Sequence, residues 1–285
     1  MFGDYDVLMP VFANLVLPQL FGIPVAVLAL PLFTLAIICG LWVASFFPRA
    51  KMLRLKGMEL ARTGRPAEAE RCFCKALARG SKVPPADQVR LLVCLGDALM
   101  DQGRYPESQH CLDTAMELGD PTGGCQSSIA QLLLLQGIDP QKALEMAEKG
   151  MELSASGPQG NYSHDWGERI GNLARSGFWA QKAWALALLG RQRDAHEAVE
   201  RALQLLESAQ TGSPESKTAP MFGPDLLSAM RLGACETEWR TGMALLALRE
   251  GDQAAVHFGI AYDTDRKNKY GLLARQQLKQ LSEPT

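Results

Sequence analysis

One stretch of this sequence occurs twice, and that repetition constrains the fold more than any other feature. RTGRPAEAERCFCKAL begins at Arg62 and DQGRYPESQHCLDTAM begins at Asp101, so the two copies align residue for residue at an offset of 39. In both copies a glycine is followed by small and large apolar residues at spacings of three and four, which places these residues on one face of a helix. One helix pair cannot bury such a face alone, so the repetition predicts helix pairs that stack on one another.

The alignment extends upstream into a preceding helix, so each copy is a pair of helices joined by a turn. A small residue early in the first helix, a glycine in the turn and apolar residues in the second helix recur together. The aligned pairs are Gly57 with Gly96, Leu60 with Leu99, Gly64 with Gly103, Ala69 with Ser108, Cys72 with Cys111, Phe73 with Leu112 and Ala76 with Ala115.

This pattern resembles the tetratricopeptide repeat family, in which a large residue is followed by Leu-Gly, an aromatic residue, Ala, Phe, Ala and Pro. The second copy keeps Leu95, Gly96, Tyr105, Ala115 and Pro121, and it has Ser108 where alanine is usual. The resemblance implies an all-α solenoid of helix-turn-helix units.

Three weaker units follow the first two, at residues 129–153, 178–206 and 238–262. The segment 265–281 has apolar residues on one face and polar residues on the other, as a terminal capping helix requires. Two stretches rich in Ser, Gly and Pro, 154–168 and 208–224, interrupt the periodicity and predict loops, either on a binding face or as plain spacers. We therefore expect about five units and a C-terminal capping helix within residues 49–282.

The first part of the chain carries no charge from Val7 to Phe47, a run of 41 residues. Because a helix needs about 20 apolar residues to cross a membrane, residues 25–47 predict the main transmembrane span. The chain begins MFGDYD, without the basic residues of a secretory signal, which favours a permanent anchor over a cleaved peptide. Residues 7–22 are short for a second span and predict an interfacial lead-in or a re-entrant hairpin. We assign residues 1–48 to a membrane anchor.

Four basic residues directly follow the predicted span: Arg49, Lys51, Arg54 and Lys56. No basic residue precedes the span, so the positive-inside rule predicts an anchor, single-pass or hairpin, with the C-terminal domain in the cytoplasm. The seven cysteines, an odd number without framework spacing, agree with a reducing compartment. The four basic residues set the topology, or they also bind anionic lipid headgroups.

No motif of catalysis, metal binding or nucleic-acid binding stands out. All 29 Lys and Arg lie at or after Arg49, and the 31 acids less Asp4 and Asp6 leave 29 acids beside them, so no basic excess suits nucleic acid. Neither a C-x-x-C pair nor a G-x-S-x-G, H-E-x-x-H or phosphate-binding motif occurs. Cys72 and Cys111 occupy the same small slot of successive repeats, which favours packing over metal binding. We expect no enzymatic activity, no metal, no cofactor and no small-molecule substrate.

In tetratricopeptide repeat proteins the first helix of each pair lines a concave groove, so the resemblance implies a set of partner-contacting residues. These are Arg54, Met58, Arg62, Arg90, Asp97, Asp101, Trp184 and Arg240. Chaperone-binding members carry Asn where this chain has Met58 and Asp97, so a chaperone-tail receptor is not expected. Trp184 is suited either to anchoring a partner peptide or to filling the core.

These observations predict a membrane-anchored scaffold or adaptor that recruits or positions a partner protein and is not an enzyme. The alternative is a structural subunit of an envelope assembly or secretion complex in which the anchor drives association. Ala36, Gly40 and Ala44 lie at i, i+4 and i+8, which permits close helix packing in a membrane.

Overall fold

The computed structural model describes residues 49–79, 83–156, 164–211 and 223–283. The chain divides into two units, Met1–Met52 and Leu53–Thr285, and only the last four residues of the first unit are described. The predicted span at 25–47 and the lead-in at 7–22 therefore lie outside the described residues. Among the residues that were described, no helix is both long enough and apolar enough to cross a membrane.

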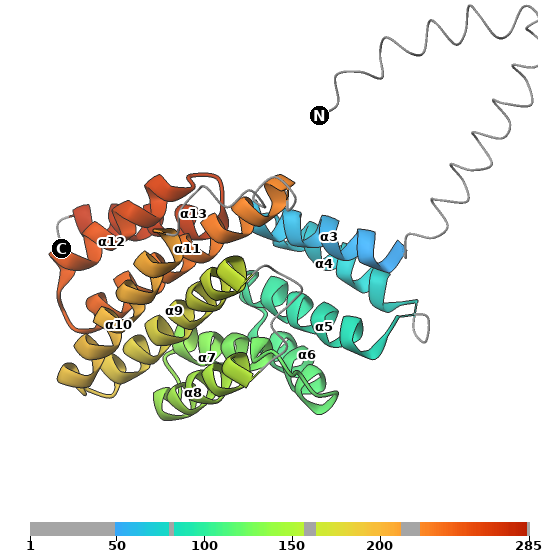
Figure 1. Cartoon of the computed structure of the whole chain (residues 1–285), viewed down its shortest axis with the longest axis horizontal. Helices are drawn as coiled ribbons and strands as arrows, with labels where there is room; N and C mark the ends of the chain where they lie inside the picture. The colour runs from blue at the N-terminus through green and yellow to red at the C-terminus, as the bar shows by residue number, and fades with distance from the viewer. Residues whose placement is uncertain (1–48, 80–82, 157–163, 212–222, 284–285) are drawn as a thin grey trace, which may run out of the picture. The chain divides into compact units, whose positions relative to one another are not determined.

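Over its described residues the second unit is built from helices alone, and Figure 1 shows consecutive helices paired as hairpins. The pairs are α3 (Arg49–Arg62) with α4 (Pro66–Leu77), α5 (Pro85–Met100) with α6 (Tyr105–Glu117), α7 (Gly124–Gln136) with α8 (Pro140–Ser156), α9 (His164–Leu188) with α10 (Gln192–Gln210), and α11 (Gly223–Ala247) with α12 (Gly251–Thr264). A single helix, α13 (Lys269–Ser282), follows where the capping helix was predicted. The predicted all-helical architecture of hairpins is confirmed.

A close contact between a small and a large residue joins the two helices of the first, second and fifth hairpins. A Cβ atom on Gly57 would lie 2.5 Å from Phe73 Cε1, and a Cβ atom on Gly242 would lie 2.6 Å from Phe258 Cε1. In each hairpin the small residue of the first helix occupies a position that we call the small slot, and the residue sixteen positions later, in the second helix, occupies the large slot. The two slots hold Gly57 and Phe73, Gly96 and Leu112, Ala130 and Met146, Ala183 and Val199, and Gly242 and Phe258. Glycine therefore stands where the opposing residue is Phe or Leu, and alanine where it is Met or Val.

The turn within each hairpin also repeats. Its left-handed residue comes seven positions after the small slot and is Gly64, Gly103, Gly137, Gly190 or Arg249. In every turn the following backbone N–H donates to a carbonyl five residues earlier, as Arg104 does to Leu99 at 3.0 Å and Glu250 to Leu245 at 2.9 Å. Four turns thus use the residue without a Cβ atom, and the fifth places an arginine at φ 66°.

Arg249→Gly is expected to stabilise the chain by about 1 kcal/mol, because a residue with a Cβ atom is strained in the left-handed region. The Arg249 side chain is exposed, so its removal sacrifices little packing. Gly190→Ala, at the equivalent turn, is the matched reverse change and should destabilise by about the same amount. Urea denaturation measures the free energy of unfolding of both variants. Changes of the same sign in the two variants would contradict the prediction.

The Ser- and Gly-rich stretches predicted as loops at 154–168 and 208–224 need correction at their ends. Ser154 to Ser156 belong to α8, and residues 164–168 begin α9. The first three residues of the second stretch belong to α10, and its last two begin α11; residues 157–163 and 212–222 lie outside the described part. Packing between α9 and α11 outweighs the weak local preference of Ser, Gly and Asp for turns.

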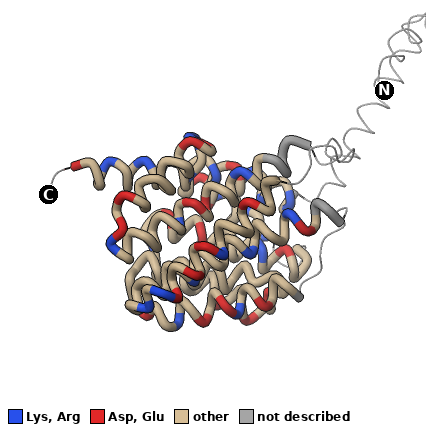
Figure 2. Tube along the Cα trace, turned by 60° about the vertical axis from the view of Figure 1, so that its left-hand side comes forward, with Lys and Arg blue, Asp and Glu red and all other residues tan. Residues whose placement is uncertain are grey.

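The core continues along the hairpins and contains an aromatic cluster beneath α13. Trp184 meets Trp239 edge to face with ring centroids 5.7 Å apart, and Trp239 meets Tyr270 at 5.6 Å. All three side chains are at most 3% exposed. Lys, Arg, Asp and Glu are interspersed along the helices in the view of Figure 2, without a face of one sign.

Candidate partner-binding site

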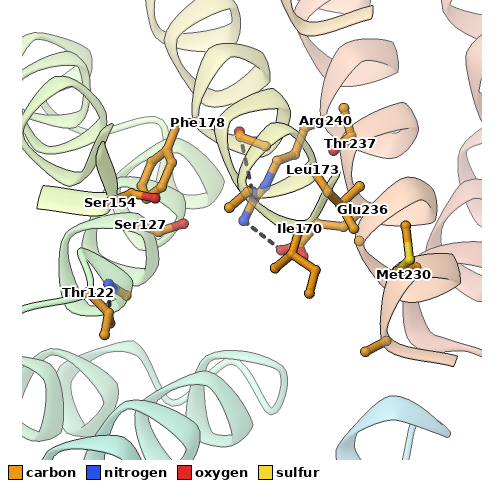
Figure 3. Close-up of a pocket in the computed structure, with 15 residues that line it drawn as sticks. Thr122, Ser127, Ser154, Ile170, Leu173, Phe178, Met230, Glu236, Thr237 and Arg240 are labelled. Atoms are coloured by element: carbon orange, nitrogen blue, oxygen red, sulfur yellow. Dashed lines mark hydrogen bonds and ion pairs between the residues drawn. The ribbon is translucent and has the colours of Figure 1, made fainter. Parts of the chain in front are cut away.

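A pocket of about 370 Å³ opens between the start of α7, the end of α8, α9 and α11. We call it the α9–α11 pocket. Ile170, Leu173, Phe178 and Met230 form apolar walls, and Arg240 lies at its inner end (Figure 3). The remaining lining residues are Thr122, Gly124, Ser127, Ser154, Ala174, Gly177, Ala229, Gly233, Glu236 and Thr237.

The pocket exists because two first helices are longer than the others. α9 begins 19 residues before its small slot (183 minus 164), and α11 begins 19 before its own (242 minus 223), whereas α5 begins 11 before Gly96. Both helices are therefore extended by the same length, eight residues or about two turns, and they pack against each other before reaching their small slots. A Cβ atom on Gly233 would lie 2.9 Å from Leu173 Cδ2, and Ser176 Oγ meets Thr237 Oγ1 at 3.1 Å.

The polar floor of the pocket is fixed by hydrogen bonds before anything binds. Arg240 is 5% exposed, and its guanidinium donates to Gln131 Oε1 at 3.2 Å and to the Gly177 carbonyl at 3.4 Å. It also forms an ion pair with Glu236 at 2.6 Å. The Tyr270 hydroxyl donates to the same Glu236 carboxylate, which links the floor to α13.

Beneath the floor lies a cluster of charges between α5 and α13. Lys269 Nζ lies 3.1 Å from Asp101 Oδ2. Burial raises the pKa of the Asp97 carboxyl to about 6, against the opposing attraction of Lys269 and a hydrogen bond from Ser128. Asp101 and Glu236 raise it further, because they are like charges nearby. Burial and Glu236 also raise the pKa of the Tyr270 hydroxyl, so this group remains a hydrogen-bond donor.

The structure distributes the predicted groove residues over two environments. Asp97, Asp101 and Arg240 join a charge network with α13, in which Arg240 is buried, Asp97 is half-buried and Asp101 is exposed. Trp184, 3% exposed, lies in the core. The other four predicted residues lie outside this network, on α3 and α5. Arg54 is half-buried, and Met58 and Arg90 are exposed. Arg62 forms ion pairs with Glu59 at 2.7 Å and with Asp265 at 3.4 Å. Their contact with a partner stays a prediction. α13 therefore meets part of the surface that the resemblance assigned to a partner.

Several pocket residues were missed in the sequence. Glu236 and Thr237 directly precede the fifth predicted unit, which begins at residue 238. Ile170 and Met230 lie on the helical extensions that follow the Ser- and Gly-rich stretches. Their signal is the equal number of helical residues ahead of the two small slots, which the standard repeat pattern does not contain.

The described residues offer little for covalent or metal chemistry. No group of three or more His, Cys, Asp or Glu within them is arranged to hold a metal ion. Burial raises the pKa of the Cys94 and Cys125 thiols to about 12, so neither is a nucleophile at neutral pH. Cys74 is exposed, but burial of its sulfur and nearby Glu70 raise its pKa as well.

Hairpins with this small–large contact and this turn resemble tetratricopeptide repeat units. No protein family matches the sequence, and no curated protein matches it significantly. Among solved structures, residues 41 to the end of MamA from Desulfovibrio magneticus RS-1 match with 18% identity and a TM-score of 0.41, covering 76% of this chain and 96% of that one.

Two further structures match at similar levels. YrrB, described as a TPR protein with an unusual peptide-binding site, has 14% identity and a TM-score of 0.37 over 82% of this chain and 95% of its own. The TPR2AB domain of yeast Sti1, in complex with pHSP90, has 15% identity and a TM-score of 0.32 over 82% and 98%. Likenesses of this size transfer no binding partner to this chain.

Proposed function

We propose that the chain is a non-catalytic scaffold, held at a membrane by its uncharged N-terminal segment, that binds a segment of a partner protein in the α9–α11 pocket. The observation that carries the proposal is the pocket itself, which two equally extended helices build onto an otherwise regular stack of hairpins. Insertions in a helical repeat commonly map to its binding face.

The pocket has the composition of a peptide-binding site. Its walls are apolar, and its two charged groups, Arg240 and Glu236, are held in place by hydrogen bonds with Gln131, Gly177 and Tyr270. A volume of about 370 Å³ accommodates one or two large side chains of a partner. Because Arg240 is already ordered, a partner that packs against it loses less conformational entropy on binding. Leu173, Phe178 and Met230 provide the apolar area for an aliphatic or aromatic anchor residue.

The membrane part of the proposal is supported by the sequence. Forty-one uncharged residues precede Arg49, and four basic residues follow within eight positions, a pattern that favours a cytoplasmic location for the repeat unit. The proposed role is to hold a cytoplasmic partner close to the membrane surface.

Photo-crosslinking in cells tests the pocket. A photoreactive residue is placed at Ala174 or Ala229, which are exposed and line the pocket, or at Ala67, an exposed alanine of α4 that serves as the control. We expect the two pocket positions to give the same defined protein adduct and residue 67 to lack it. In the Ala174-labelled chain, Ala229→Trp fills the pocket and should reduce the adduct at least several-fold.

Adducts that are identical at all three positions, or that persist in the Ala229→Trp chain, would reject the pocket as the binding site. The alternative role, a structural subunit whose anchor drives assembly, predicts that the same partners remain associated through residues 7–47 alone. Association that survives removal of the whole repeat unit would favour that alternative.

A further inference from the structure

Helix α3 carries exposed apolar side chains outside the contact with its hairpin partner α4. Gly57 presses on Phe73 and marks the packed side. Away from this contact Leu55 is 48% exposed and Met58 is 43% exposed. Both belong to the second unit, and we call them the α3 apolar pair.

The charges around the α3 apolar pair are basic. Lys56 is exposed and Arg54 is half-buried beside the pair. The first acid of α3 is Glu59, and its carboxylate accepts hydrogen bonds from Arg62 at 2.7 and 2.9 Å, which neutralise it locally. The pair is therefore flanked by two cations whose charge is not balanced within α3.

A second exposed apolar pair shows what is special about α3. On α12, Val256 is 60% exposed and Ile260 is 43% exposed. That helix contains no Lys or Arg, and it carries Asp252 and Asp263. Exposure alone is thus shared by the two surfaces, and positive charge beside the exposed side chains distinguishes α3 from α12.

The occupant that fits the α3 apolar pair is the surface of an anionic lipid bilayer. Interfacial helices combine apolar side chains that enter the headgroup region with Lys or Arg that reach phosphate groups. The uncharged segment of the chain ends at Phe47, eight residues before Leu55, so an anchor there keeps α3 near the bilayer.

We propose that α3 lies against the anionic face of the membrane, with Leu55 and Met58 in the interface and Arg54 and Lys56 on lipid phosphates. This inference rests on the proposed membrane anchor. It adds that the first helix of the repeat unit is itself a lipid contact, which fixes the orientation of the hairpins relative to the membrane.

The test uses the full chain reconstituted into vesicles of phosphatidylcholine with phosphatidylserine, or of phosphatidylcholine alone. An environment-sensitive fluorescent amino acid replaces Leu55, Met58 or, as a control, Val256, and lipids with brominated tails serve as quenchers. In the serine-lipid vesicles, quenching at residues 55 and 58 should exceed that at 256 several-fold. Lys56→Glu should reduce it, and Lys149→Glu, at an exposed lysine of α8, should leave it unchanged.

The outcomes separate this inference from the proposed anchor. A chain that floats with the vesicles while residues 55 and 58 are quenched no more than 256 would overturn the lipid contact and leave the anchor standing. Quenching that Lys56→Glu and Lys149→Glu reduce equally would also overturn it, because the charge beside the pair would then be irrelevant. Failure of the chain to float with either vesicle would overturn both.

Discussion

Gly242→Ala is expected to destabilise the chain by about 2 kcal/mol, because it overpacks the contact between α11 and α12. The new Cβ atom would lie 2.6 Å from Phe258 Cε1 and 2.7 Å from Cδ1. Phe258 is fully buried, so its ring has little room to move away. Gly259→Ala is the matched control on the neighbouring helix, because its Cβ atom would meet nothing within 4 Å. That change should stabilise the helix by about 0.5–1 kcal/mol.

The repeat itself indicates how the damage can be repaired. In the fourth hairpin the same two slots hold Ala183 and Val199, and both residues are buried. Phe258→Val alone should cost about 3 kcal/mol, because it leaves a cavity. Combined with Gly242→Ala, it recreates the pair of the fourth hairpin and removes the clash. The loss of free energy of unfolding in the double variant should therefore be smaller than the sum of the two single losses by at least about 1 kcal/mol.

A double-mutant cycle measures this coupling by urea denaturation of the fragment 49–285. Costs that add without coupling would show that the two slots do not act as one contact. A stabilising effect of Gly242→Ala alone would show that α11 and α12 can separate at this point without loss, which the burial of Phe258 argues against.

The sequence predicted the hairpins because their determinants are local. The small slot, the left-handed turn and the large slot lie within sixteen residues of sequence, so a fixed spacing reports them. The third and fourth hairpins were less clear than the first two, since Gly57 and Gly96 are conspicuous whereas Ala130 and Ala183 are ordinary helix residues. The slot requires only a side chain small enough for its partner.

The interior of the site was not predictable in the same way. Lys269 reaches Asp101 across 168 residues of sequence, and Tyr270 reaches Glu236 across 34. No local pattern shows that α13 packs against the first helices of other hairpins, so Asp97 and Asp101 were assigned to a groove instead of to a charge network with α13. The extended starts of α9 and α11 were concealed for a different reason, because Ser- and Gly-rich sequence is compatible with helix when a neighbour packs against it.

Asp97→Asn is expected to stabilise the folded chain above pH 7 by about 3 kcal/mol, the equivalent of two pKa units. Burial raises the folded-state pKa of Asp97 from 3.8 to about 6, although Lys269 and Ser128 act in the opposite direction. Between these values the unfolded chain loses the proton while the folded chain keeps it, so stability falls as the pH rises. Above the folded pKa the full cost of the buried charge remains, and below the unfolded pKa it vanishes.

The measurement is urea denaturation of the wild type and the Asp97→Asn variant from pH 4 to pH 8. The difference in free energy of unfolding should be near zero at the acid end, grow through the interval and become constant above it. Asp263→Asn, which removes an exposed carboxylate paired with Arg266, should show no comparable growth. A variant less stable than the wild type at pH 8 would mean that attraction to Lys269 exceeds the cost of burial. Asp97 would then hold α13 against α5, and the charge network of Asp97, Asp101 and Lys269 would stabilise the fold instead of destabilising it.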